Sequence, residues 1–161
     1  MTLDQLQLLV LIIVANGAPI VLRSLLDNRY ATPVDFGLTL PDKRPLFGES
    51  KTWRGLAGAI VLTSAVAMVL GYSAVTGALI AVYALSGDLF SSFIKRRLGM
   101  APSSMEPLLE QVPESLFPAV MFRGEFGLNA LSIMILVSVF VVAELILSNV
   151  LYKLGIRNRP Y

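Results

Sequence analysis

One stripe of an expected helix over residues 74–94, continued by the residues just after it, carries groups that could bind both a cation and an anion. The stripe consists of Asp88, Ser91, Ser92 and Lys95, which stand at i, i+3, i+4 and i+7. Asp88 could ligate a metal ion, and Lys95 could hold a phosphate group together with Arg96 and Arg97. Without Asp88, the three basic residues would indicate only a topogenic cluster at a membrane surface.

The segment 48–55, GESKTWRG, has the composition of a phosphate-binding site at the start of a helix. Its candidate binding residues are Gly48, Ser50, Lys51, Thr52 and Arg54. A serine or threonine can cap the helix, whose free N–H groups attract anions, and Lys51 and Arg54 add positive charge. The segment is not a P-loop, because it lacks the Gly-Lys-Ser/Thr adjacency. Trp53 and Arg54 alone would also suit anchors at a membrane interface.

A pair of glutamates in the segment 106–122 could bind a hard cation. Glu110 and Glu114 stand at i and i+4, with Gln111 beside them, so the two carboxylates share one helix face. Like charges this close repel each other unless a cation or basic groups hold them, and carboxylate oxygens are ligands that Mg²⁺ prefers. We therefore expect Asp88, Glu110 and Glu114 to be metal ligands.

The chain contains no histidine and no cysteine, which limits the chemistry open to it. Disulfides, zinc or haem sites built on those ligands and every Ser-His or Cys-His catalytic arrangement are excluded. Magnesium with cationic side chains suits a polyphosphate substrate, since the cations neutralise charge on the bridging and leaving oxygens. Such a reaction needs no covalent protein nucleophile.

The composition places these groups in a membrane protein. Of 161 residues only 15% are charged, against about a quarter in soluble domains, and 55% are hydrophobic, with a mean hydropathy of +0.72. A chain of this length cannot bury so much apolar surface within itself, so the excess must face lipid. The net charge of +2 then reports orientation rather than a nucleic-acid partner. We treat residues 1–161 as one domain.

The charge-free stretches predict an all-α integral membrane protein with five transmembrane helices. The expected bounds are about 3–22, 55–71, 74–94, 106–122 and 127–151, with a turn at 71–73. This layout places all but one of the 13 Lys and Arg residues on one side of the membrane, the exception being Arg123. Because basic residues accumulate in cytoplasmic segments, we expect the N-terminus outside and the C-terminus in the cytoplasm.

Polar residues from four of the expected helices share one depth. Asn16, Asp88, Glu110, Glu114 and Glu144 all fall roughly 6 to 12 Å inside the expected cytoplasmic face, at 1.5 Å per residue. Ionisable groups within a membrane usually line a cavity or pair with one another. A polar cavity open to the cytoplasm accounts for the set, although Glu144 could equally snorkel toward the headgroups. A nucleotide would enter this cavity from the cytoplasm and a second substrate from the lipid.

Taken together, these segments resemble the CDP-archaeol synthase family, which is related to the phosphatidate cytidylyltransferases. The resemblance rests on Asn16-Gly17-Ala18-Pro19, Asp35-Phe36-Gly37, GESKTWRG at 48–55, GDLFSSFIKRRLG at 87–99 and Glu110-Gln111-Val112-Pro113-Glu114, in the family's order and at similar spacing. The last of these motifs usually begins with Asp-Gln in the family, whereas this chain has Glu110, one methylene longer.

The resemblance implies a multi-pass enzyme of the cell membrane that transfers the cytidylyl group of CTP to an unsaturated archaeal ether-lipid phosphate. The products would be pyrophosphate and a CDP-activated lipid for phospholipid biosynthesis, with Mg²⁺ as cofactor. Asp88, Lys51 and Lys95 would be catalytic, with Asp88 holding Mg²⁺ on the triphosphate. The residues assigned to substrate binding are Asn16, Asp35, Lys43, Arg44, Gly48, Ser50, Thr52, Arg54, Ser92, Arg96, Arg97 and Gln111.

Other functions stay open at this point. A CDP-alcohol phosphatidyltransferase would carry a spaced run of aspartates around an Ala-Arg pair, which this sequence lacks. A small membrane transporter or scaffold could use the intramembrane carboxylates to conduct protons or to pair helices, but it would leave the segment 48–55 without a role. Within the enzymatic interpretation, another lipid phosphate could replace the archaeal acceptor.

Overall fold

The structure is a computed structural model that describes residues 1–27, 29–100 and 106–155. Within these residues the chain forms five helices and no strand. The helices are α1 (Leu3–Leu26), α2 (Trp53–Val69), α3 (Ala74–Arg97), α4 (Pro107–Met121) and α5 (Ala130–Lys153). The prediction of an all-α fold with five helices is therefore confirmed.

Side-chain caps fix where four of the helices begin. The capping residues are Thr2, Thr52, Ser73 and Asn129, and each accepts a hydrogen bond from a backbone N–H within the first turn. α3 continues past the predicted bound of 94 to Arg97, so the basic cluster forms its last turn, where positive charge complements the helix dipole. Gly99 follows in the left-handed conformation, with φ of 74°, which favours glycine just after a helix.

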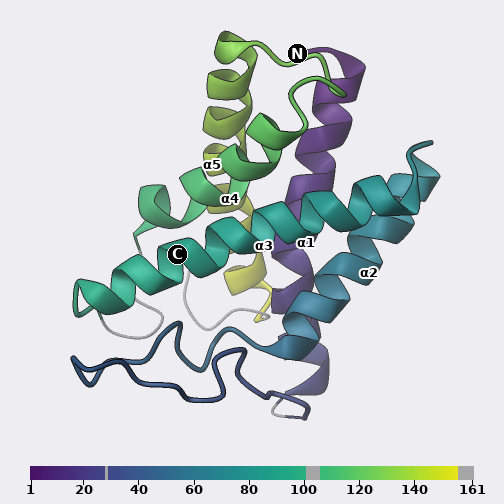
Figure 1. Ribbon diagram of the computed structural model, residues 1–161. Coiled ribbons are helices and arrows are strands. Elements are labelled where there is room, and N and C mark those ends of the chain that lie inside the picture. Colours follow the sequence, from purple (N-terminus) through teal and green to yellow (C-terminus); the bar gives the residue numbers. More distant parts are fainter. Residues whose placement is uncertain (28, 101–105, 156–161) are drawn as a thin grey trace.

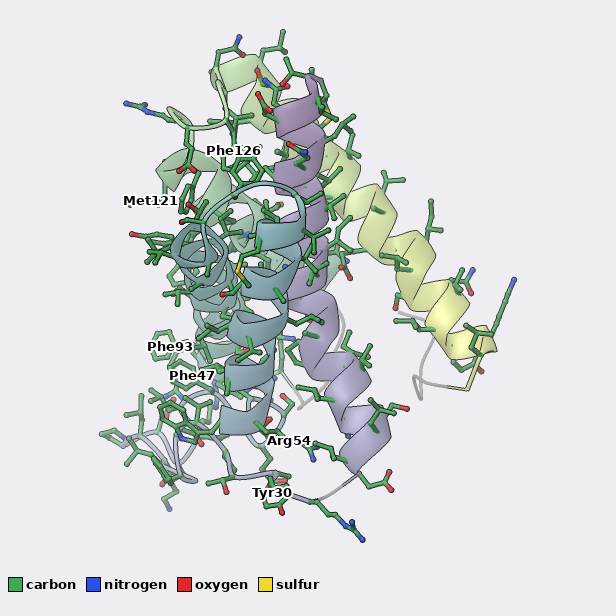
Figure 2. The ribbon with its side chains drawn as sticks, turned by 90° about the vertical axis from the view of Figure 1, so that its right-hand side faces the viewer. Tyr30, Phe47, Arg54, Phe93, Met121 and Phe126 are labelled. Atoms are coloured by element: carbon green, nitrogen blue, oxygen red, sulfur yellow. The ribbon has the colours of Figure 1, made fainter. Side chains whose placement is uncertain are left out.

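α3 is the central helix of the bundle, since it packs against α1, α2 and α4. In Figure 1, α3 and α4 run side by side across α1. α5 contacts α4 and α1, and its C-terminal half diverges from α1 (Figure 2). Residues 29–52, here called the first connection, form an irregular segment at one end of the bundle (Figure 1).

The core changes character along the bundle. Far from the first connection, large apolar side chains such as Leu8, Ile80 and Phe140 are completely buried. Nearer to the first connection, alanines line the interfaces between α1, α2 and α3; they are Ala15, Ala18, Ala59, Ala81 and Ala84. Small side chains let helix backbones approach closely. The polar residues of α3 beyond Ala84 therefore lie close to the neighbouring helices.

The fold is that of a multi-pass membrane protein. α1, α3 and α5 are each 24 residues long and apolar enough to cross a membrane, while α2 is a shorter apolar helix. α5 presents mostly exposed apolar side chains, including Met134 and Val142, as expected where a helix faces lipid. α4 has 15 residues, with Pro113 and Pro118 inside it. The orientation of the chain across the membrane stays a prediction.

We predict that Gly77→Ala destabilises the α2–α3 interface. A Cβ atom at Gly77 would lie 2.7 Å from both the Cα atom of Ser64 and the carbonyl oxygen of Thr63, and backbone cannot move aside as a side chain can. Overpacking of this kind costs about 1–3 kcal/mol. Thermal unfolding in detergent should show a lower midpoint for this variant. Gly17→Ala is the matched helical control, because nothing lies within 4 Å of its added Cβ; an equal loss in both variants would contradict the prediction.

Candidate active site

The centre of the site is an ion pair between the first connection and the middle of α3. The Nζ atom of Lys51 lies 2.5 and 2.6 Å from the two carboxylate oxygens of Asp88. Burial lowers the pKa of Lys51, but the carboxylates of Asp88, Glu114 and Glu110 together raise it by more, so the pKa lies above its usual value and the ammonium stays charged. Lys51 and Asp88, both predicted to be catalytic, are thus brought together.

Glu114 of α4 joins this pair. Its side chain is buried and within hydrogen-bonding reach of the Asp88 carboxyl group, and Glu144 of α5 interacts with it electrostatically. Gly87 makes the approach possible, because a Cβ atom there would lie 2.7 Å from the backbone nitrogen of Glu114. The close packing of α3 on α4 therefore depends on a glycine directly before Asp88.

A second ion pair lies further along α3. Lys95 is buried, with 6% of its surface exposed, and its Nζ donates to a carboxylate oxygen of Glu110 on α4. Arg96 beside it is also buried, and its charge interacts with the Glu110 carboxylate. Ser92 is buried on the same stripe. α3 thus takes part in two lysine–carboxylate pairs, one of Asp88 with Lys51 of the first connection and the other of Lys95 with Glu110 of α4.

The carboxylate of Asp35 organises the first connection. Its oxygens accept hydrogen bonds from the backbone N–H groups of Phe47 at 2.9 Å, Gly48 at 3.0 Å and Gly37 at 3.0 Å. Burial raises the pKa of Asp35, but hydrogen bonds from these donors and from its own backbone N–H together lower it by more, so the pKa lies below its usual value. The structure therefore gives Asp35 contacts with the chain itself and makes it the organiser of the turn before Lys51.

Residues around the start of α2 also make contacts within the protein. The hydroxyl of Thr52 accepts from the N–H of Gly55, which is the predicted cap. Arg54 donates to the carbonyl oxygens of Arg29 and Asp27, just after α1, and so fixes the end of that helix. Ser50 is exposed beside Lys51. Of the basic residues expected in the phosphate site, Lys51 is the one that the structure directs to Asp88.

The remaining candidates lie around this centre. The Asn16 amide donates to the carbonyl oxygen of Ile12 in its own helix, and Lys43 is exposed in the first connection. Arg44 and Arg97 donate to backbone carbonyl oxygens at 2.5 to 3.4 Å, Arg44 to those of the last turn of α3 and Arg97 to those of the first connection. These two arginines tie the connection to α3.

The predicted metal ligands are divided between the two ion pairs. In the described part of the chain, no group of three or more acidic, His or Cys side chains is arranged to hold a metal ion. The donors nevertheless have the right chemistry for Mg²⁺, since Asp88 and Glu114 are in contact. Gln111, one turn before Glu114, adds a buried side-chain oxygen that has no hydrogen-bond partner.

Two residues of this region lie outside the set predicted from sequence. Gly87 permits the contact between α3 and α4, and its position within the GD dipeptide at 87–88 was the available signal. Asp42, which binds Arg97, stands in an exposed turn next to Lys43. A single acidic residue in a polar loop gives no pattern by which sequence could have identified it.

A model of the CarS-like family, described as CDP-archaeol synthase, matches residues 3–161. The chain belongs to this family. It is 36% identical over 104 residues to the CDP-archaeol synthase of Hyperthermus butylicus, which covers 61% of this chain and 59% of that protein. The chain thus aligns with about three fifths of that relative. With the CDP-archaeol synthase of Thermofilum pendens, identity is 32% over 155 residues, covering 92% of this chain and 76% of that one.

The fold agrees with this membership. A solved structure, described as an intramembrane enzyme for archaeal membrane lipids biosynthesis, superposes with a TM-score of 0.73 at 30% identity. The match covers 87% of this chain and 89% of that chain. The resemblance to the CDP-archaeol synthase family is confirmed.

We predict that Asp35 stabilises the fold in a pH-dependent way. Its pKa in the folded chain lies below the unfolded value of about 3.9, so the stabilisation is complete above that value and is lost as the pH falls through the folded pKa. Asp35→Asn should therefore lower the unfolding temperature at about pH 7, and the difference from wild type should shrink at about pH 3. Glu49→Gln, a change at an exposed carboxylate of the same connection, is the control. A constant difference for Asp35→Asn across this range would disprove the assignment.

Proposed function

We propose that this protein transfers the cytidylyl group of CTP to an archaeal-type ether-lipid phosphate, which gives a CDP-activated lipid and pyrophosphate. The main support is the convergence of Lys51, Asp88 and Glu114 from three separate segments on one partly buried point, in a chain of the CarS-like family. The second pair, Lys95 and Glu110, lies further along the same helix. These are the groups that a triphosphate and a divalent cation require.

The lysines would change partners when CTP binds. Phosphate oxygens are strong acceptors, so Lys51 and Lys95 would donate to the triphosphate in place of Asp88 and Glu110. A phosphate oxygen of the lipid then attacks the α-phosphorus of CTP, and the bond from that phosphorus to the bridging oxygen breaks, which releases pyrophosphate. The lipid phosphate is already ionised at neutral pH, so the reaction needs no general base. The role of the protein is to orient the groups and to balance their charge.

Asp88 and Glu114 would hold Mg²⁺ once Lys51 has moved to the triphosphate, with Glu110 and Gln111 beside them. Two carboxyl groups in contact repel each other when both are ionised, so a cation between them removes an unfavourable interaction. Bound there, Mg²⁺ would supply positive charge to the bridging and leaving oxygens of the triphosphate. Glu110 is the less direct ligand, since it is paired with Lys95 on the outer part of the stripe.

The membrane setting gives the two substrates separate routes. The exposed apolar faces of α1, α3 and α5 suit a lipid bilayer, which we propose to be the cell membrane. With the N-terminus outside, the first connection and the basic end of α3 would face the cytoplasm, where CTP is found. The lipid phosphate would reach the same site from the inner leaflet.

The test is lipid-dependent release of pyrophosphate by the purified protein with labelled CTP and Mg²⁺. Separate reactions contain an unsaturated archaeal ether-lipid phosphate, a diacyl phosphatidic acid or no lipid. We expect the ether lipid to support turnover, and Asp88→Asn and Lys51→Ala each to reduce the rate by about 10²-fold or more.

The matched control is Lys153→Ala, a lysine at the exposed end of α5. It should retain the wild-type rate, and thermal unfolding should show that all variants fold. If only phosphatidic acid supports turnover, the lipid acceptor in the proposal is wrong and the reaction, cytidylyl transfer to a lipid phosphate, is retained. No turnover with any lipid phosphate, or full activity in Asp88→Asn, would refute the proposed function.

A further inference from the structure

Arg97, at the end of α3, is bound to the first connection by both terminal nitrogens of its guanidinium. Its Nη1 lies 2.7 Å from each carboxylate oxygen of Asp42, and its Nη2 donates to the carbonyl oxygens of Pro45 at 2.6 Å and Arg44 at 3.2 Å. The guanidinium also lies over the ring of Phe93, 5.4 Å from its centroid. Such a planar fork fixes orientation as well as distance.

Arg44 makes the reverse contact, from the first connection to α3. Its Nη1 donates to the carbonyl oxygen of Arg97 at 2.5 Å and to that of Arg96 at 3.4 Å, at the negative end of the helix dipole. Asp42 accepts from the backbone N–H of Arg44 at 3.1 Å, so one carboxylate binds both arginines. A Cβ atom at Gly99 would lie 2.9 Å from the Arg44 guanidinium, so glycine leaves the room that this contact needs. We call Asp42, Arg44 and Arg97 the clasp.

The clasp sits just before the segment that carries Lys51. From Pro45 the chain runs through Gly48, whose N–H is held by Asp35, to Lys51, which returns to Asp88 on the same helix α3. The segment 42–51 is therefore attached to α3 at both ends, by the clasp and by the Lys51–Asp88 pair. If a triphosphate takes Lys51 away from Asp88, the clasp is the attachment that remains.

We propose that Asp42, Arg44 and Arg97 are positioning residues that hold Lys51 in place for CTP, and that Arg44 and Arg97 do not bind the triphosphate. The proposal rests on the proposed function and refines it, since sequence analysis had assigned both arginines to substrate binding. The two terminal nitrogens of Arg97, Nη1 and Nη2, already have four acceptors within the protein, and its Nε atom is buried. The clasp acts through Lys51 and makes no contact with the reacting atoms.

Removing Asp42 distinguishes the two roles by the sign of its effect. If Arg97 bound the triphosphate, Asp42 would compete for it, and Asp42→Ala would lower the KM for CTP. If the clasp positions Lys51, the same substitution loosens the segment 42–51 and raises that KM. Asp42→Ala and Arg97→Ala should then raise the KM for CTP alike, because each removes the same ion pair between Asp42 and Arg97.

The experiment is steady-state kinetics on Asp42→Ala, Arg97→Ala and the double variant. We expect each single change to raise the KM for CTP about 10-fold, to leave the KM for the lipid phosphate unchanged, and the double variant to be no worse than Arg97→Ala. Arg97→Lys should fail to restore the KM, because it keeps the charge but loses the fork. Glu49→Ala, which removes the same charge from the same connection, should have no effect if geometry rather than net charge matters.

Amide hydrogen exchange tests the clasp independently of turnover. Exchange in 46–51 should be faster in Asp42→Ala and Arg97→Ala than in wild type, and unchanged in Glu49→Ala. An inactive wild-type protein would refute the proposed function while leaving this measurement able to decide about the clasp. A lower KM for CTP in Asp42→Ala, recovery in Arg97→Lys, or unchanged exchange in both clasp variants would overturn the inference. Asp42 is an exposed side chain, so its variant serves if Arg97→Ala does not fold.

Discussion

A buried charge needs a partner, and this requirement shapes the half of the bundle that carries the site. Lys51 and Lys95 lie at low exposure in an apolar protein, where an isolated ammonium would be strongly disfavoured. Each is matched by a carboxylate from another element, Asp88 for the first and Glu110 for the second. The pairing fixes the position of the first connection over α3 and the register of α4 against it.

The helix α3 can take part in both ion pairs and in the apolar core because its residues change from small and apolar to charged along its length. Its first half packs small and apolar side chains against α1 and α2, with Gly77 at the closest approach. Gly87 then admits the backbone of α4, and Asp88 follows directly. The last turn is basic and receives the contacts from the first connection. One helix thus joins the apolar core, the acidic centre and the attachment of the loop.

The parts of the structure that follow from local pattern could be predicted from sequence, and those that depend on long-range contacts could not. Apolar run length gave the helices, and helical spacing placed Asp88 and Lys95 on one stripe. Spacing does not reveal which basic side chains bind backbone carbonyl oxygens within the protein. Arg44, Arg54 and Arg97 look like phosphate ligands in sequence, yet each donates to carbonyl oxygens of the chain itself. Arg44 and Arg54 donate to those at or just after a helix end, and Arg97 to that of Pro45 in the first connection. Which oxygens these arginines bind depends on how the first connection packs against the helices, which local spacing in the sequence does not determine.

The resting ion pairs also bear on how a substrate could enter such a site. A lysine held by a carboxylate is already desolvated and oriented, so moving it to a phosphate exchanges one charge-assisted hydrogen bond for another. The carboxylate that is released is then available to a cation that arrives with the triphosphate. The exchange conserves the number of paired charges in this region. A site whose lysines had no carboxylate partner would be costly to fold, and a site whose lysine–carboxylate pairs could not separate would not bind the triphosphate. The arrangement of Lys51 between Asp88 and an incoming phosphate satisfies both conditions, provided that the segment which carries the lysine stays in place during the exchange.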